Sequence, residues 1–272
     1  MASRTTIGVF DSGFGGLTVL KALLELIPGA DYLYFGDTAR LPYGSKSVET
    51  VARYAVEAAH FLEHHGAQML VIACNTATAL ALDQITAAAH VPVVGVVDPG
   101  ALAASSATKN TKVVVIGTDA TVSSHAYRKA LEARGVNARE KACPLLVPLV
   151  EEGWVEHAVT EQVARIYLDE AFADGFADAD TLVLGCTHYP LLKPLLHRVA
   201  PAHVSIVDSA QSTAHVVAEL VKVIPQPGPE KKETHEKKLK FFATDSTEKF
   251  RRLGQRFLGH PIVDVQHVDL KE

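Results

Sequence analysis

Apolar segments of strand length alternate with segments of helical period along most of the chain. The pairs are "TIGVF" before "LTVLKALLEL", "QMLVIA" before "TATALALDQITAAA", "VPVVGV" before "PGALAASSA", "KVVVIG" before "ATVSSHAYRKALEARG", "TLVLG" before "YPLLKPLLHRV" and "VSIV" before "SAQSTAHVVAELVKV". The strand segments are rich in Val, Ile and Leu on both faces, which is typical of a parallel sheet covered by helices. The pattern predicts a doubly wound α/β fold, which ends in a strand, a helix and a strand at "LKFFAT", "STEKFRRLGQRFLG" and "PIVDV".

Two parts of the chain are similar to each other. "QMLVIACNTATALA" around Cys74 is similar to "DTLVLGCTHYPLLK" around Cys186, and "GVVDPGA" around Asp98 is similar to "SIVDSAQ" around Asp208. Chance similarity is the competing explanation, because any two strand–helix units share apolar strands and small turn residues. We infer two related α/β lobes.

Composition favours a small-molecule partner. The chain has 272 residues, a net charge of -5 and a pI near 6.2, which give no overall attraction for nucleic acid or an anionic membrane surface. It lacks an apolar run of membrane-spanning length, and the short apolar stretch in "MASRTTIGVF" argues against export, so we expect a cytoplasmic protein. Residues 224–240, "IPQPGPEKKETHEKKLK", predict a solvated connector, because glutamates interrupt the basic residues.

Polar motifs follow several of the predicted strands. They are "VFDSGFGG", "YFGDTARLPYGS", "IACNTAT", "VIGTDATVS" and "LGCTHYP". In open α/β sheets ligands bind beyond the carboxyl ends of the strands, so these motifs outline a candidate site. Gly13, Gly15 and Gly16 suit a carboxylate anchor or a simple turn. They match a dinucleotide fingerprint poorly, because Thr18 stands where the last glycine belongs.

Cys74 and Cys186 both fall where a buried strand gives way to a helix, and there the helix dipole and free amides stabilise a thiolate. One such cysteine would indicate only a small core residue, but two at equivalent places favour chemistry. Cys143 has no matching context and is interpreted as structural. His188 can share a proton with Cys186 or cap a turn, and Asp11 can hold an ammonium group, relay a proton or serve only as a turn residue. Since a carboxylate raises the pKa of a nearby thiol, the ionisation of Cys74 stays open.

No metal site is expected. His60, His64 and His65 have helical spacing that suits a metal, but on a polar helix they more often face solvent. There is no C-x-x-C pair and no acidic run of calcium-loop spacing.

Two thiols that flank one carbon suit inversion of a stereocentre, because one thiolate removes a proton from one face while the other thiol donates to the opposite face. The motifs "GVFDSGFGGLTV", "YFGDTARLPYG", "ACNTATA", "PLVE" and "GCTHYPLL" resemble those of the cofactor-independent glutamate racemases, within the aspartate/glutamate racemase family. The resemblance runs from about residue 7 to residue 210, in family order, and the closing strand and helix also resemble that family.

The resemblance implies that Cys74 and Cys186 are the two catalytic acids and bases, assisted by Asp11 and His188. Asp37 and Glu151 are implied as supporting polar groups. The implied substrate contacts are Asp11, Ser12, Tyr43, Gly44, Asn75, Thr76, Thr187 and His188, with Thr118 and Thr121 as additional ones.

The resemblance also implies two lobes with the active site in the cleft between them, of which residues 98–210 form the lobe inserted into residues 1–97 plus 211–272. It further implies a homodimer that works without a cofactor and supplies D-glutamate for peptidoglycan.

Three other functions stay open at this point. The first is a racemase of aspartate or another amino acid, because substrate length depends on details of the pocket. The second is a hydrolase in which Cys186 and His188 form a nucleophilic pair. The third is a two-lobed binding protein whose cysteines are structural.

Overall fold

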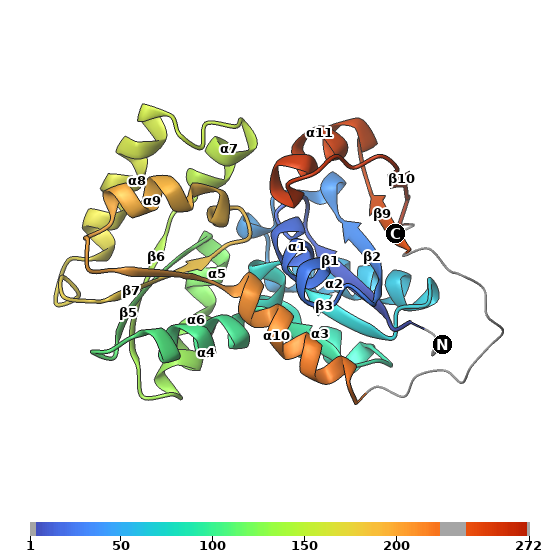
Figure 1. Ribbon diagram of the computed structural model, residues 1–272, viewed down its shortest axis with the longest axis horizontal. Helices are drawn as coiled ribbons and strands as arrows, with labels where there is room; N and C mark the ends of the chain where they lie inside the picture. The colour runs from blue at the N-terminus through green and yellow to red at the C-terminus, as the bar shows by residue number, and fades with distance from the viewer. Residues whose placement is uncertain (1–3, 224–237, 271–272) are drawn as a thin grey trace.

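The computed structural model describes residues 4–223 and 238–270, which form two parallel β-sheets with helices on both faces of each (Figure 1). This confirms the predicted α/β fold with two lobes. Most of the predicted connector lies outside the described residues. Its last two positions, Leu239 and Lys240, already belong to a strand, so the connector is shorter than expected.

The first sheet has six strands in the order β10-β9-β2-β1-β3-β4, all parallel. The strands are β1 (Thr6–Asp11), β2 (Asp31–Gly36), β3 (Met69–Ile72), β4 (Val93–Gly95), β9 (Leu239–Ala243) and β10 (Gln266–His267). The buried faces of α1 (Leu17–Leu26), α10 (Ser209–Val221) and α11 (Thr247–Leu258) cover one side, and those of α2 (Val48–His64) and α3 (Asn75–Ala88) cover the other. Two 3₁₀ turns, η1 (Thr38–Arg40) and η2 (Tyr43–Ser45), follow β2.

The second sheet has four parallel strands in the order β6-β5-β7-β8. The strands are β5 (Lys112–Gly117), β6 (Asn137–Ala142), β7 (Thr181–Gly185) and β8 (Ser205–Asp208). One side packs against α7 (Leu146–Glu151), α8 (Ala158–Ala171) and α9 (Lys193–Val199), and the other packs against α4 (Val97–Ala107) and α6 (Ala126–Glu132). The short α5 (Asp119–Ser124) follows β5, and the 3₁₀ turn η3 (Tyr189–Leu192) follows β7.

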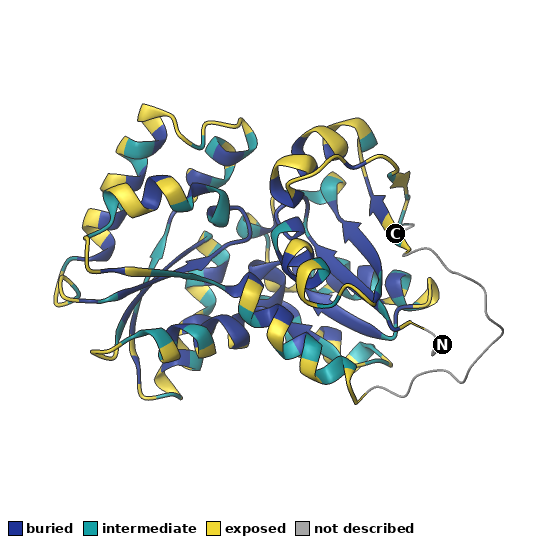
Figure 2. Cartoon of the chain, viewed as in Figure 1, coloured by how far each residue is buried: buried dark blue, intermediate teal, exposed yellow. Residues whose placement is uncertain are grey.

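The two sheets repeat one topology. The order β2-β1-β3-β4 in the first corresponds to β6-β5-β7-β8 in the second, so β3 and β7 occupy equivalent positions. Cys74 follows β3 and Cys186 follows β7, which confirms that the similarity around the two cysteines reflects two similar lobes. The two lobes also pack against each other, because one hydrophobic cluster includes Val9 of the first sheet and Ile116 of the second. In Figure 2 the buried strands lie between helices whose outer faces are exposed.

Three predicted elements differ in the structure from what their hydrophobic pattern indicates. The helix predicted over 120–135 is divided into α5 and α6 at His125, which takes a left-handed conformation with φ 55°. The helix predicted over 189–199 begins as the 3₁₀ turn η3, with Pro190 and Pro194 in the first turns of η3 and α9. The strand predicted over 261–265 is irregular, and the pairing with β9 starts at Gln266 instead.

The last helix, α11, shows how local sequence sets an element. Ser246 caps its start by accepting a hydrogen bond from the Lys249 amide at 3.1 Å, and Gly259 ends it with φ 86°, a conformation that glycine adopts readily. Its inner face buries Phe250, Leu253 and Phe257 against the core, while arginines and lysine lie on the outer face. Among residues 4–223 and 238–270, no helix is long and apolar enough to cross a membrane.

Candidate active site

Cys74 lies at the end of β3, where it caps α3. Its Sγ accepts a hydrogen bond from the Ala77 amide at 3.4 Å and donates one to Ser12 Oγ at 3.4 Å. The side chain is only 5% exposed. Burial, with the negative charge of Asp11, raises the pKa of the Cys74 thiol to about 12, although the hydrogen bonds that Cys74 makes with Ser12 and Ala77 oppose the change. The helix start therefore does not ionise this thiol, and Cys74 is a protonated thiol in the structure as it stands.

Asp11 ends β1 and is 1% exposed. Its Oδ2 accepts a hydrogen bond from the Gly13 amide at 2.8 Å, whereas Oδ1 has no hydrogen-bond partner of good geometry among the described residues. Burial raises the pKa of Asp11, and the positive charge of His188 and the polar hydrogens of Gly13, Gly16 and Thr187 only partly offset it. Asp11 thus interacts electrostatically with Cys74 and with His188, which lies on the other lobe.

Cys186 follows β7 and is 6% exposed. It does not cap an α-helix as Cys74 does, because the chain turns into η3 first. His188 Nδ1 lies 4.0 Å from Cys186 Sγ, and His188 Nε2 lies 3.2 Å from Glu151 Oε1. The imidazole therefore connects the thiol to a carboxylate.

The His188–Glu151 pair is an ion pair on the second lobe. Burial lowers the pKa of His188, but its hydrogen bonds to Cys186 and Glu151 and their negative charges outweigh burial and raise it to about 10. Partial burial raises the pKa of Glu151, yet the hydrogen bond from His188 and the charges of His188 and Lys249 leave it below its ordinary value. Cys186 therefore lies beside a cationic histidine, whereas Cys74 lies beside a carboxyl group.

The loops that carry these groups meet across the two lobes. A Cβ on Gly15, in the loop after β1, would lie 2.6 Å from His188 Nδ1, and it would also strike the Thr187 hydroxyl. A Cβ on Gly44, in η2, would lie 2.9 Å from Thr118 Cβ. Glycine at both positions thus allows the backbone of one lobe to reach the site residues of the other.

Three threonine hydroxyls form a cluster between the lobes. Thr76 Oγ1 lies 2.9 Å from Thr118 Oγ1 and 3.3 Å from Thr121 Oγ1, and the two last oxygens are 2.9 Å apart. Next to Thr76, Asn75 Oδ1 accepts a hydrogen bond from the Tyr127 hydroxyl at 2.7 Å, while Asn75 Nδ2 is buried and has no partner in the described part of the chain. An unused amide donor at this place suits a carboxylate ligand.

Asp37 holds the "PYG" turn in place through buried hydrogen bonds. Its Oδ2 accepts a hydrogen bond from the Tyr43 hydroxyl at 2.5 Å, and its Oδ1 accepts one from Thr244 Oγ1 at 2.8 Å. Arg40 completes the group with a 3.5 Å ion pair to Asp37 Oδ1. Asp37 and Tyr43 are fully or almost fully buried, so this network fixes the turn that carries Gly44.

The other chemically suggestive features lie elsewhere. Cys143 is fully buried, and burial raises the pKa of its thiol, as expected for a core residue. His60 contacts the Ala88 carbonyl and His65 stacks on Phe61 with ring centroids 4.0 Å apart. Within the described residues, no group of three His, Cys, Asp or Glu side chains could hold a metal ion.

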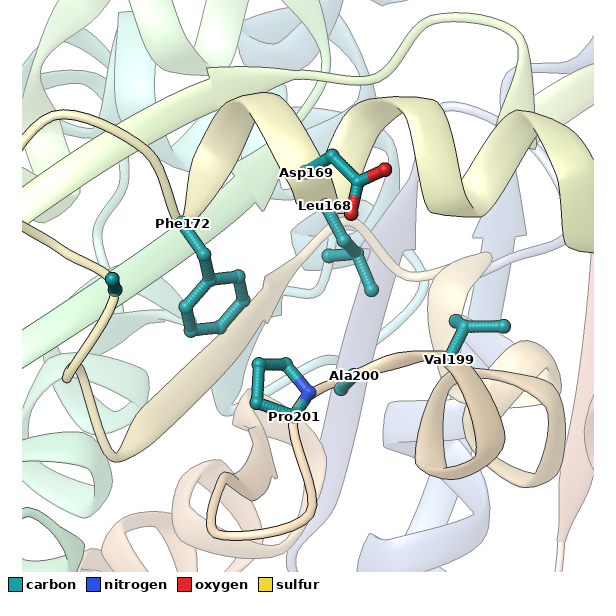
Figure 3. Close-up of a pocket in the computed structure, with 7 residues that line it drawn as sticks. Leu168, Asp169, Phe172, Val199, Ala200 and Pro201 are labelled. Atoms are coloured by element: carbon teal, nitrogen blue, oxygen red, sulfur yellow. The ribbon is translucent and has the colours of Figure 1, made fainter.

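A hollow of about 340 Å³ between α8 and α9 contains no cysteine or histidine (Figure 3). Leu168, Phe172 and Pro201 converge on it, and Asp169 is its one ionisable residue. A second hollow, of about 280 Å³, lies beside the edge strand β6 and includes His125, Arg128 and Glu140. His125 Nδ1 and the Arg128 amide already bond to Glu140, so these groups are satisfied within the lobe.

Sequence reasoning located the loops of the site but missed some of its supporting residues. Tyr127, Thr244, Arg256 and Phe257 belong to no motif, and each reaches the site residues from a distant part of the chain. The sequence shows Tyr127 and Phe257 only as members of a hydrophobic pattern. No local pattern predicted which site residue each of the four contacts.

Comparisons with known proteins agree with the fold and identify the family. The family model described as Asp/Glu/Hydantoin racemase matches residues 7–217. A glutamate racemase of Koribacter versatilis is 59% identical, over 98% of this chain and 98% of that protein. Two solved structures each cover 98% of both chains with a TM-score of 0.88. They are a glutamate racemase isoform of Bacillus anthracis at 37% identity and a glutamate racemase of Francisella tularensis, in complex with D-glutamate, at 33% identity.

Proposed function

This chain belongs to the Asp/Glu/Hydantoin racemase family, and from that premise we propose that it interconverts L- and D-glutamate by a two-base reaction at Cys74 and Cys186. It is an amino-acid racemase that supplies D-glutamate for peptidoglycan. The observation that carries the assignment of the two bases is the equivalence of β3 and β7, each of which is followed by a buried cysteine at the carboxyl edge of its sheet.

The reaction needs one thiolate and one thiol at its start. The thiolate removes the α-proton from one face of glutamate, and the thiol on the opposite face donates its proton to the resulting carbanion. The first C–H bond breaks to give the carbanion and the second then forms from the opposite thiol, so net charge is conserved and the two sulfurs exchange their protonation states. Because its pKa is raised, Cys74 is the proton donor in the state described. The cationic His188 lies beside Cys186, where it can stabilise negative charge on that sulfur.

After each turnover the sulfur that took the α-proton must lose a proton to solvent, and the other sulfur must gain one. We propose that Asp11 relays the proton at Cys74 and that His188, whose imidazolium first releases a proton to solvent, relays the proton at Cys186. Asp11 acts on Cys74 and His188 on Cys186, since each is the ionisable neighbour of its thiol. Glu151 holds His188 in the cationic form. The reset requires proton exchange with solvent, so the α-position of the product carries a solvent hydrogen.

Buried polar atoms without a hydrogen-bond partner support a proposal for how the substrate is bound. Asp11 Oδ1 suits the ammonium group, and Asn75 Nδ2 suits a carboxylate. The hydroxyls of Ser12, Thr76, Thr118, Thr121 and Thr187 and the backbone of the "PYG" turn at Tyr43 and Gly44 provide further donors. Because Cys74 and Cys186 are 5% and 6% exposed, we infer that the substrate enters when the lobes separate and is then enclosed by them.

The division into lobes follows the same proposal. We place residues 98–210 in the inserted lobe and residues 1–97 plus 211–272 in the other, since β4 ends at Gly95 and α10 begins at Ser209. The homodimer implied by the resemblance and the cytoplasmic location expected from the sequence stay predictions.

The test uses three matched cysteine variants. Purified Cys74→Ala, Cys186→Ala and Cys143→Ala are each incubated with L-glutamate in deuterium oxide without added cofactor, and chirality and α-deuteration are followed by chiral chromatography and mass spectrometry. We expect Cys143→Ala to match the wild type and the other two to lose racemisation of both enantiomers. Racemisation at near wild-type rate in either of those two would refute the two-base reaction.

Three further measurements test the alternatives that the sequence left open. A panel of acidic and neutral amino acids tests whether aspartate or another substrate is preferred to glutamate. A covalent acyl adduct on Cys186 that forms equally well in Cys74→Ala would instead favour a hydrolase. Glutamate binding without α-proton exchange in the wild type would favour a binding protein.

A further inference from the structure

The last helix, α11, packs against the six-stranded sheet and also contacts the His188–Glu151 pair of the other lobe. Figure 1 shows α11 opposite α7, the helix that ends at Glu151. Two consecutive residues of α11 make the contacts. Phe257 packs on His188, and Arg256 bonds to the end of α7.

Phe257 restrains the imidazole of His188. Its ring is 3% exposed, and its centroid lies 5.1 Å from the His188 ring centroid at an interplanar angle of 76°, an edge-to-face contact. The two nitrogens of that imidazole face Cys186 and Glu151. Phe257 thus supplies the contact that fixes the plane of a ring whose two nitrogens must point in set directions.

Arg256 holds the carbonyl end of α7. Its Nη1 donates to the Glu151 backbone oxygen at 3.2 Å. The guanidinium lies against Gly153, where a Cβ would be 2.6 Å from Nη1 and 3.1 Å from Cζ. Gly153 has φ 84°, so a glycine both allows this turn and leaves the space that the guanidinium fills.

We propose that Phe257 and Arg256 are positioning residues for His188, through which α11 of one lobe holds the imidazole of the other between Cys186 and Glu151. Neither residue belongs to the set of substrate contacts. The proposal rests on the proposed function, because it assigns to α11 the task of keeping one proton-transfer group in line with its thiol. It also makes the alignment of His188 depend on the lobes being together.

The first test compares substitutions of two phenylalanines, Phe257 and Phe250, that lie two turns apart on the buried face of α11. Phe257→Leu keeps apolar volume but removes the ring, and Phe250→Leu makes the same change in the core contact with Phe14, whose ring centroid lies 5.7 Å away. We expect Phe257→Leu to lower kcat about 10-fold to 100-fold with KM changed less than about twofold, since a small misplacement of a reacting group costs rate rather than affinity. Phe250→Leu should keep kcat near the wild-type value at a similar loss of Tm.

The second test measures the ionisation of His188 and does not depend on catalytic activity. Nitrogen-15 NMR of the full chain follows the His188 imidazole, assigned by its loss in His188→Gln, as pH is raised with no substrate present. The groups that face His188 are Cys186, Glu151 and Asp11, with Lys249 behind Glu151. We expect the titration midpoint in Phe257→Leu to fall from near 10 towards the ordinary value of 6.5, and that in Phe250→Leu to stay unchanged.

Arg256 is tested with a conservative rescue. Arg256→Ala should lower kcat by about 3-fold to 10-fold, a smaller effect because its hydrogen bond lies at an exposed position, and Arg256→Lys should recover most of the loss since an ammonium can still donate to the carbonyl. Arg252→Ala, on the exposed face of α11, is the control and should match the wild type.

Unchanged kcat and unchanged His188 titration in Phe257→Leu would overturn the positioning role, as would an equal loss of kcat in Phe250→Leu. If Cys186→Ala still racemises glutamate, the proposed function fails instead, and the titration results still decide whether α11 orients His188.

Discussion

Gly15 is the point at which the addition of one methyl group should disturb the reaction far more than the stability of the fold. An alanine Cβ there would lie 2.6 Å from His188 Nδ1 and 2.9 Å from His188 Cε1, against an ordinary contact of 3.4 Å or more. The His188 ring must therefore move by about 1 Å, a displacement of the size that costs about 100-fold in rate when it misaligns a reacting group. Gly15 does not have a positive φ, so its backbone accepts an alanine and the effect is steric.

We expect Gly15→Ala to lower kcat for glutamate racemisation about 100-fold, and over-packing to lower the free energy of unfolding by about 1–3 kcal/mol. The assay is kcat and KM in both directions by circular dichroism, with Tm measured on the same samples. Gly29→Ala is the matched control, because nothing lies within 4 Å of an added Cβ there, and it should behave as the wild type. A Gly15→Ala enzyme with kcat within twofold of the wild type would refute the claim that the two loops are packed at contact distance.

Three other changes test separate parts of the site. Tyr127→Phe leaves buried Asn75 Oδ1 without its donor and should lower the free energy of unfolding by about 1–3 kcal/mol in urea titrations, and no change would mean that the bond is not formed. Thr121→Val removes one hydroxyl of the threonine cluster at nearly constant volume and should raise KM about 10-fold, whereas an unchanged KM would exclude Thr121 from substrate binding. Because folding raises the pKa of His188, its protonation stabilises the folded state fully below pH 6.5, and this contribution is lost as pH rises through about 10. The free energy of unfolding of the wild type should therefore decline over that pH range, and His188→Gln should lack the decline. Parallel pH profiles would contradict it.

The sequence was informative where local pattern and burial coincide. Strands such as β1, β3 and β7 are buried on both faces, so their Val, Ile and Leu runs are visible in one dimension. The repeated motifs around Cys74 and Cys186 indicated the equivalence that the strand orders then showed. Strand β6, "NAREKA", was not predicted, because it is an edge strand with only one buried residue and its polar alternation has no apolar signal.

Other features depend on distances that no local pattern contains. The break at His125 interrupts a helical period that continues on both sides, so the sequence predicted one helix. The pKa of Cys74 depends on burial and on Asp11, and burial outweighs the favourable helix start that the sequence suggested. Phe257 and Arg256 lie far along the chain from His188 and Glu151, and only the tertiary fold brings them together.

The pairing of β2 with β9 also determines the order in which the molecule can assemble during synthesis. Tyr32 pairs with Leu239 and Gly36 with Ala243, so β2 gains its outer neighbour only after nearly the entire chain has been synthesised, although β2, β1, β3 and β4 all lie within residues 6–95. Residues 112–208 contain every strand of the other sheet and can close earlier. Until β9 arrives, β2 has an unpaired edge that other nascent chains can pair with, which makes this interval the stage most exposed to aggregation.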